Sequence, residues 1–204
     1  MRIGKVGIVD YGIGNQISIQ KCLKLNGIKS IISNELEILE ECSAILLPGV
    51  GAFAPSIKLL KRKNLDAFIQ KKAKDKHPII GICLGMQLLC DKSYENGEHQ
   101  GLGLLPGVVE PISKNNNYHI GWNNLKIIKN NNFINNKNQY FYFNHSYGVK
   151  SINEYTIGTS SFENHEFSSL IQKDNIVGVQ FHPEKSQENG RILFLKIMRD
   201  LINA

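Results

Sequence analysis

The segment IIGICLGMQLL, residues 79–89, joins an apolar strand-like run to a helix-like run through a cysteine. A strand that ends at Ile82, followed at once by a helix, forces Cys83 into a tight turn. Glycines 81 and 85 allow close approach of the backbone where a side chain would clash. This is the geometry of a nucleophile elbow with cysteine in place of serine, so the segment predicts a reactive thiol. The alternative for any single cysteine is a small buried apolar side chain.

The residues before and after this segment alternate between short β-rich runs and helical patterns. Strands are expected at 5–12, 28–33, 43–49 and 78–83, and helices at 15–27, 35–41, 56–75 (one or two) and 84–91. Asn15 and Gly27 are expected as the N-cap and the C-terminal stop of the first helix. Such alternation is typical of a parallel sheet with helices on both faces.

The second half of the chain is mostly strand-like. Strands are expected at 107–112, 121–128, 139–150, 154–161, 167–172 and 176–181, before a last helix at 187–203. The Asn-rich stretches 115–117 and 130–138 are expected as loops. We therefore predict an α/β fold with an open, mostly parallel central sheet flanked by helices and additional antiparallel strands in the C-terminal half. No linker divides the chain, so residues 1–204 are expected to form a single domain.

Composition is that of an ordinary globular protein, with 42% hydrophobic and 21% charged residues. No apolar run approaches the roughly 20 residues that cross a bilayer, and no signal peptide is evident at the start, so we expect a cytoplasmic protein without membrane contact. The net charge of +6 comes largely from lysines at 58–76. Leucines and other apolar residues at helical spacing separate these lysines, which favours a solvated helix face over a nucleic-acid site.

Four cysteines show neither a CxxC pair nor the spacing of metal ligands. In a reducing compartment they are expected to be free thiols. We therefore expect neither a metal nor another cofactor.

A base for the thiol is indicated by VGVQFHPEKS, residues 177–186. Alternating side chains predict a strand up to His182, and Pro183 favours an extended conformation for the histidine before it. If the backbone stays extended, His182 and Glu184 point to the same side. The carboxylate can then orient one imidazole nitrogen while the other faces the thiol, as in a catalytic triad. The alternative is a structural histidine at a strand end.

The segment LLPGVGAF, residues 46–53, places two glycines directly after a strand. The backbone N–H groups of such a turn can converge on an anion. Together with the N–H of Leu84, the turn of Gly49, Val50 and Gly51 is a candidate for stabilising the oxyanion of a tetrahedral intermediate. A phosphate site is the alternative, although no G-K-[ST] follows.

The motifs PGVGAF, GICLGMQLL and HPEKS occur in the order of the class I (triad-type) glutamine amidotransferases, and the chain resembles this family over essentially its whole length. The resemblance implies a flavodoxin-like sheet. Within the family, VDYGIGN, GWNNL and HSY resemble the glutaminase subunits of imidazole glycerol phosphate synthases, which act in histidine biosynthesis.

The resemblance implies a role for each matching residue. Cys83 is the expected nucleophile, His182 the general base and then acid, and Glu184 the residue that orients it. The expected oxyanion and substrate residues are Gly49, Val50, Gly51, Leu84, Gln87, His145, Ser146 and Tyr147. Gln87 matches the residue that holds the amino-acid end of the substrate. Trp122, Asn123 and Lys185 match positions that face a partner subunit.

The implied reaction is hydrolysis of glutamine to glutamate and ammonia through a thioester on Cys83. The ammonia passes to a separate synthase (cyclase) subunit, a (βα)8 barrel by family resemblance, in a heterodimer. The chain is then a hydrolase that contributes to a lyase activity in the complex. Full glutaminase activity is expected only with the partner bound.

Two departures from the family pattern, at residues 116–119 and at Asn144, keep the acceptor open. The first alternative is the glutaminase subunit of an amidotransferase that acts on nucleotide-linked or surface-polysaccharide sugars. A second is a cysteine hydrolase or protease on a similar scaffold, which Gln87 and Glu184 disfavour. A binding module with an inert thiol and a nucleic-acid binder are further alternatives; salt-dependent retention on DNA or RNA identifies the latter.

Overall fold

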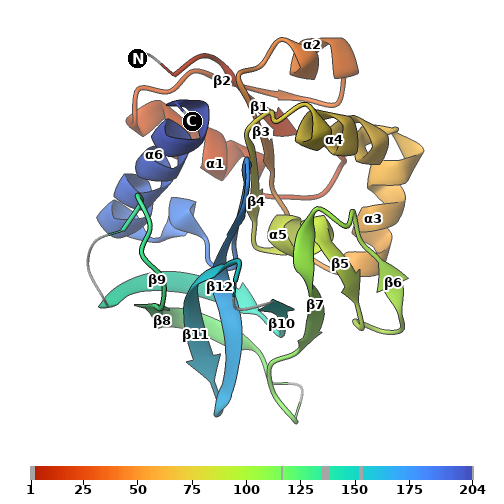
Figure 1. The fold of residues 1–204 in the computed structure, drawn as a ribbon. Coiled ribbons are helices and arrows are strands. Elements are labelled where there is room, and N and C mark those ends of the chain that lie inside the picture. The colour runs from red at the N-terminus through yellow and green to blue at the C-terminus, as the bar shows by residue number, and fades with distance from the viewer. Residues whose placement is uncertain (1–2, 116, 135–137, 152–153, 204) are drawn as a thin grey trace.

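The computed structural model describes residues 3–115, 117–134, 138–151 and 154–203. Its centre is a parallel sheet in the order β2-β1-β3-β4-β13 (Figure 1). The strands are β1 (Val6–Val9), β2 (Ser30–Ser33), β3 (Ala44–Leu47), β4 (Ile79–Ile82) and β13 (Ile176–Val179). All of them except β2 are buried at every position, as expected for strands covered on both faces. The mostly parallel sheet predicted from the sequence is confirmed.

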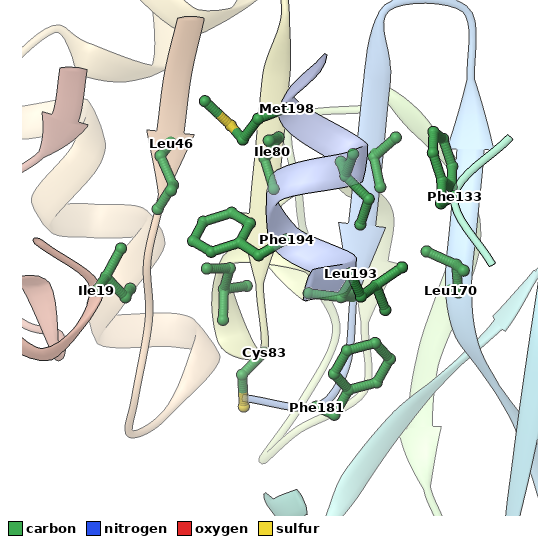
Figure 2. Close-up of a cluster of buried hydrophobic side chains, with 14 of the residues drawn as sticks. Ile19, Leu46, Ile80, Cys83, Phe133, Leu170, Phe181, Leu193, Phe194 and Met198 are labelled. Carbon is green, nitrogen blue, oxygen red and sulfur yellow. The ribbon is translucent and has the colours of Figure 1, made fainter. Parts of the chain in front are cut away.

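Helices cover both faces of this sheet, and alternate strand residues pack against each layer (Figure 1). One layer holds α1 (Gln16–Leu25) and α6 (Gln187–Asn203). The other holds α2 (Leu36–Glu40), α3 (Phe53–Arg62), α4 (Leu65–Lys74) and α5 (Leu84–Leu89). In β4, Ile80 faces the α6 layer, where Phe194 and Met198 lie beside it in Figure 2, whereas Ile79 belongs to the opposite cluster.

Strands that mostly pair antiparallel extend the sheet beyond β13; the additional antiparallel strands were predicted. The continuing order is β12 (His165–Lys173), β10 (Tyr147–Ser151), β7 (Leu105–Pro111), β5 (Cys90–Ser93) and β6 (His99–Gln100). The pair β5 and β7 is the exception, because these two strands run parallel. A side branch carries β11 (Thr156–Phe162), β8 (His119–Ile127) and β9 (Asn138–His145). Every strand of the described residues belongs to this sheet, and we propose that the chain forms one domain.

Several predicted boundaries differ from the structure. The helix predicted to reach residue 91 ends at Leu89, and the chain turns directly into β5; neither β5 nor the short β6 was predicted. The single strand predicted at 139–150 breaks at Ser146 because β9 pairs with β8, whereas β10 pairs with β7 and β12. The segment 56–75 forms two helices, separated where Asn64 adopts a left-handed conformation with φ 56°.

The helix-end predictions have mixed outcomes. Gly27, with φ +71°, directly follows the C-cap of α1 and is confirmed as its stop. Asn15 is at the N-cap position, but its side chain makes no capping hydrogen bond. In the basic segment, Lys72 is an exception to the predicted solvated face, because it is buried with its Nζ 2.9 Å from Glu40 Oε1.

All four cysteines are free thiols, as predicted, and all four are buried. None of the described helices is long and apolar enough to cross a membrane. Of the Asn-rich stretches, Asn116 and residues 135–137 lie outside the described residues, and Asn138 already begins β9.

Candidate active site

Cys83 forms the junction between β4 and α5. Its backbone has φ 52° and ψ −113°, a conformation that few residues with a side chain adopt and that costs about 1–3 kcal/mol. A Cβ at Gly85 would collide with the carbonyl oxygen of Leu47, and one at Gly81 would lie 2.8 Å from the backbone nitrogen of Met86. The predicted elbow, with glycines required on both sides, is confirmed.

His182 and Glu184 are in direct contact. Imidazole Nδ1 lies 2.8 Å from Glu184 Oε1, and both side chains are fully buried. The predicted reason for this contact is wrong, however. His182 itself is extended, but Pro183–Lys185 form a 3₁₀ turn, so the carboxylate reaches the ring from a turn and not from a continuing strand.

The Cys83 sulfur interacts with the imidazole of His182. Burial alone would lower the pKa of His182, but the charge of the neighbouring Cys83, followed by the bond and charge of Glu184, raises it to about 10. His182 Nε2 itself has no hydrogen-bond partner among the described residues and is free to exchange a proton. The raised pKa favours a protonated ring next to the sulfur. A protonated imidazole beside a thiolate is the arrangement of an activated cysteine nucleophile.

Asn15 also contacts Glu184, a contact that was not predicted from the sequence. Its Nδ2 donates to the same Oε1 that accepts from His182, whereas Oε2 is buried without a hydrogen-bond partner among the described residues. Asn15 comes from the loop after β1, at the same end of the parallel sheet as the elbow. Its place in VDYGIGN was the available signal, but that motif says nothing about contact with a residue 169 positions away.

A cavity of about 350 Å³ opens at Cys83, near the low end of the ~300–1,000 Å³ typical of small-molecule sites. Its lining includes these predicted residues: Val50, Gly51, Cys83, Leu84, Gln87, His145, Ser146 and Tyr147. Its lining also includes Ala52 and Glu95, which were not predicted, and Tyr118 and Asn144, which belong to the two departures from the family pattern. Gly49 does not line it, because it packs against the elbow, where a Cβ would lie 2.7 Å from the Gly85 nitrogen.

The amide of Gln87 has a fixed orientation. Its Nε2 donates to the carbonyl of Tyr147 at 2.8 Å and to Gln180 Oε1 at 3.1 Å. Both donors are therefore used within the protein, which leaves Oε1 as an acceptor. Glu95 is a second acceptor in the cavity, and its Oε2 accepts the backbone N–H of Phe53 at 2.7 Å. The cavity thus offers two acceptors suited to an ammonium group.

His145 is part of a buried pair with His119. Because His145 Nδ1 donates to the Tyr147 carbonyl at 2.8 Å, its Nε2 must accept from His119 Nδ1 at 3.3 Å. Burial lowers the pKa of His145 to about 3 and that of His119 to about 4. Both rings are therefore neutral at physiological pH and form an uncharged wall of the site.

The three residues predicted to face a partner lie on or near β8 and the turn after His182. Trp122 is 47% exposed and packs edge-on against Tyr142, and Lys185 Nζ lies 5.6 Å from the centre of the same ring. Asn123 uses its Nδ2 inside the chain, on His119 Nε2 at 3.0 Å and the Ser161 carbonyl at 2.9 Å. Their contact with a partner stays a prediction.

Comparison with known proteins agrees with this geometry. The model of the family "Glutamine amidotransferase class-I" matches residues 7–199. The chain is 42% identical over 200 residues to imidazole glycerol phosphate synthase subunit HisH of Oceanobacillus iheyensis, covering 97% of this chain and 99% of that protein. It is 41% identical over 187 residues to the subunit of the same name from Aquifex aeolicus, covering 90% of each.

Solved structures show the same fold at lower identity. The structure of PurLQS from Thermotoga maritima superposes with a TM-score of 0.76 at 21% identity, covering 98% of this chain and all of that chain. A glutamine amidotransferase from the same organism superposes with a TM-score of 0.71 at 15% identity, covering the whole of both chains. From the family match over almost its entire length, we conclude that the chain is a member of the class-I glutamine amidotransferase family.

Proposed function

We propose that this chain is the glutaminase subunit of an imidazole glycerol phosphate synthase and acts in histidine biosynthesis. Near-full-length relatives bearing that subunit name support the assignment. The observation that carries the chemistry is the interaction of Cys83, His182 and Glu184 at the edge of a cavity of about 350 Å³. We assign Cys83 as nucleophile, His182 as proton donor and acceptor, and Glu184 as the carboxylate that orients His182.

Glutamine enters with its side-chain amide at Cys83. In this proposal its α-ammonium group binds Gln87 Oε1 and the Glu95 carboxylate, two acceptors that line the cavity. Ser146 and Tyr147 line the same cavity and contact the rest of the amino-acid end. The neutral His145 adds no charge to compete with the ammonium group for the two acceptors.

The thiolate attacks the side-chain carbonyl carbon, forming a C–S bond while the carbonyl π electrons move to oxygen. Backbone N–H groups of the turn at Val50 and Gly51, with that of Leu84, stabilise the oxyanion. His182, protonated at the start because of its raised pKa, gives its proton to the amide nitrogen. The C–N bond then breaks, releasing ammonia and leaving a glutamyl thioester on Cys83.

Water completes the cycle. His182, now neutral, accepts a proton from the attacking water, and the second tetrahedral intermediate expels the Cys83 thiolate to give glutamate. Glu184 keeps the imidazole in one orientation through both steps, since its Oε1 stays on Nδ1.

The ammonia is used by a synthase subunit, for which we propose a (βα)8 barrel bound as a heterodimer in the cytoplasm. Ile120, Trp122 and Tyr140 support a docking surface on β8 and β9, because these large apolar side chains are 62%, 47% and 57% exposed. Neighbouring exposed apolar side chains are typical of a protein interface. Asn123 and Lys185 are the polar residues that we place beside this surface.

Ammonia release from glutamine tests the proposal. The full chain is assayed alone and with the synthase subunit that co-purifies with it, with and without that subunit's acceptor substrate. We expect slow release by the isolated chain, faster release in the complex, and no release by the Cys83→Ala complex. Absence of glutamine-dependent ammonia from the complex would refute the function, and full activity without a partner would refute the coupling.

A further inference from the structure

Gln180 turns a hydrogen-bond donor to the nucleophile, whereas the Asn144 carbonyl, 3.9 Å from the same sulfur, can only accept. Gln180 is fully buried and directly follows β13, and its side-chain Nε2 lies 3.7 Å from the sulfur of Cys83. Its Oε1 accepts from Gln87 Nε2 at 3.1 Å. The side chain therefore connects the sulfur to a residue that lines the substrate cavity.

The direction of these hydrogen bonds is set by a backbone carbonyl. The carbonyl of Tyr147 can only accept, so the group that Gln87 presents to it at 2.8 Å must be the N–H2. The same N–H2 group also donates to Gln180, so the side-chain oxygen of Gln180 must be the acceptor. The nitrogen of Gln180 is then the atom turned to the sulfur.

A donor aimed at sulfur distinguishes the two ionisation states of Cys83. A thiolate accepts such a bond strongly, because bonds to an ionised group are roughly twice as strong as neutral ones, whereas a thiol is a weak acceptor. Burial increases the difference, since water cannot replace the lost donor. An N–H held here therefore stabilises the ionised sulfur.

We propose that Gln180 is a catalytic residue whose side-chain N–H stabilises the Cys83 thiolate, with its orientation fixed through Gln87 by the Tyr147 carbonyl. The role rests on the proposed function, where the thiolate is both the attacking group and the group expelled from the thioester. The contact with sulfur does not depend on which substrate is used, so it is testable without glutamine.

Other titratable residues lie around the sulfur of Cys83 or line the cavity next to it. His182 interacts with it directly, and Glu184 acts through His182. Tyr11 interacts with Cys83 electrostatically, and burial raises the pKa of its phenol, so it stays neutral. Glu95 and the neutral His145 line the cavity.

The experiment measures alkylation of Cys83 by iodoacetamide in the full chain as a function of pH, with peptide mass spectrometry to follow this site alone. Gln180→Met removes the donor at similar length. Gln180→Glu keeps the size but places a carboxylate oxygen against the sulfur. Ser169→Ala is the matched control, because Ser169 is fully buried on β12 and its carbonyl accepts the Gln180 backbone N–H at 2.9 Å.

We expect the acid-side midpoint of alkylation to move up by about one pH unit in Gln180→Met, a tenfold change in the ionisation equilibrium, and further in Gln180→Glu. Ser169→Ala should stay within about 0.3 unit of the parent, since it changes packing but not the sulfur contact. Unshifted midpoints in both folded Gln180 variants would overturn the proposal.

A measurement on the unchanged chain covers the case in which the variants do not fold. The side-chain amide signals of Gln180 in an NMR titration should move with the same midpoint as alkylation, and signals that stay constant would overturn the proposal. Failure here is distinct from failure of the proposed function. Shifted midpoints without ammonia release refute only the glutaminase, and ammonia release with unshifted midpoints refutes only Gln180.

Discussion

The parallel and antiparallel parts of the sheet contribute to the site in different ways. In the parallel part, the backbone fixes the nucleophile: Cys83 has a positive φ, and glycines at 81 and 85 are needed for the elbow to pack. In the antiparallel part, side-chain hydrogen bonds fix the pocket wall, with His145 held between His119 and the Tyr147 carbonyl. Backbone geometry therefore places the reacting atom, and a buried polar network shapes the space next to it.

The largest expected effect separates two cysteines at opposite ends of α5. Cys83→Ser should lower glutaminase activity of the complex by about a thousandfold or more, because a serine hydroxyl is not ionised at this site. Cys90→Ser should retain activity within about threefold. Cys90 is equally buried at the other end of α5, but burial raises the pKa of its thiol and its Sγ donates to the Met86 carbonyl at 3.4 Å. Equal losses in the two variants would contradict the assignment of Cys83.

The second test disrupts the close backbone packing that holds the elbow at Cys83. Gly85→Ala should lower the free energy of unfolding by about 3 kcal/mol or prevent folding, because the new Cβ meets the Leu47 carbonyl oxygen. Gly103→Ala is the matched control, with φ +66° and open space around the Cβ, and should cost about 1 kcal/mol. Urea unfolding gives both values. A Gly85 variant as stable as the Gly103 variant would show that the elbow tolerates a side chain.

The third test addresses the side-chain network through pH. In the folded chain the pKa of His119 is lowered to about 4 and that of His145 to about 3, whereas an unfolded histidine titrates near ~6.5. The unfolded chain therefore binds more protons below ~6.5, and stability is lost as pH falls. Between pH 7 and 5 we expect a loss of roughly 2 kcal/mol per histidine.

His119→Phe isolates this contribution, because a phenyl ring fits between the stacked rings of Phe143 and Phe162. It should reduce the drop in unfolding free energy between pH 7 and 5 by about 2 kcal/mol, the contribution of one histidine. The raised pKa of His182 makes the folded state more stable as pH falls from 7 to 5. This contribution is the same in the parent and in His119→Phe, so it cancels when the two proteins are compared. Identical pH dependence in parent and variant would show that the buried pair is not the cause.

The smallest expected effect concerns Asn15, which crosses from the loop after β1 to Glu184. Asn15→Ala should lower kcat about tenfold with KM changed less than twofold, because Glu184 keeps its bond to His182 but loses a second donor. Asn26→Ala is the control, since Asn26 joins α1 to Arg191 of α6 at the other end of the helix. An unchanged kcat for Asn15→Ala would remove this residue from the site.

The sequence predicts the backbone-determined part of the site well. A glycine on each side of Cys83 and a proline after His182 are local signals, because they restrict the chain within a few residues. Asn15 and Gln180 were not predicted as site residues. Asn15 contacts Glu184, 169 positions away, and Gln180 contacts Cys83, 97 positions away, so no local pattern indicates either contact. The same limit explains β5, which exists because Cys90 to Ser93 pair with β7 rather than through any strong strand pattern of their own.

Labelling by a glutamine-analogue electrophile tests the central assignment most directly. The complex is treated with one equivalent of the reagent, and the adduct is located by peptide mass spectrometry while ammonia release is followed. We predict a single adduct on Cys83 that appears in proportion to the loss of activity, is prevented by glutamine, and is absent from Cys22, Cys42 and Cys90. Loss of activity with Cys83 unmodified, or an adduct shared among the four cysteines, would contradict the account.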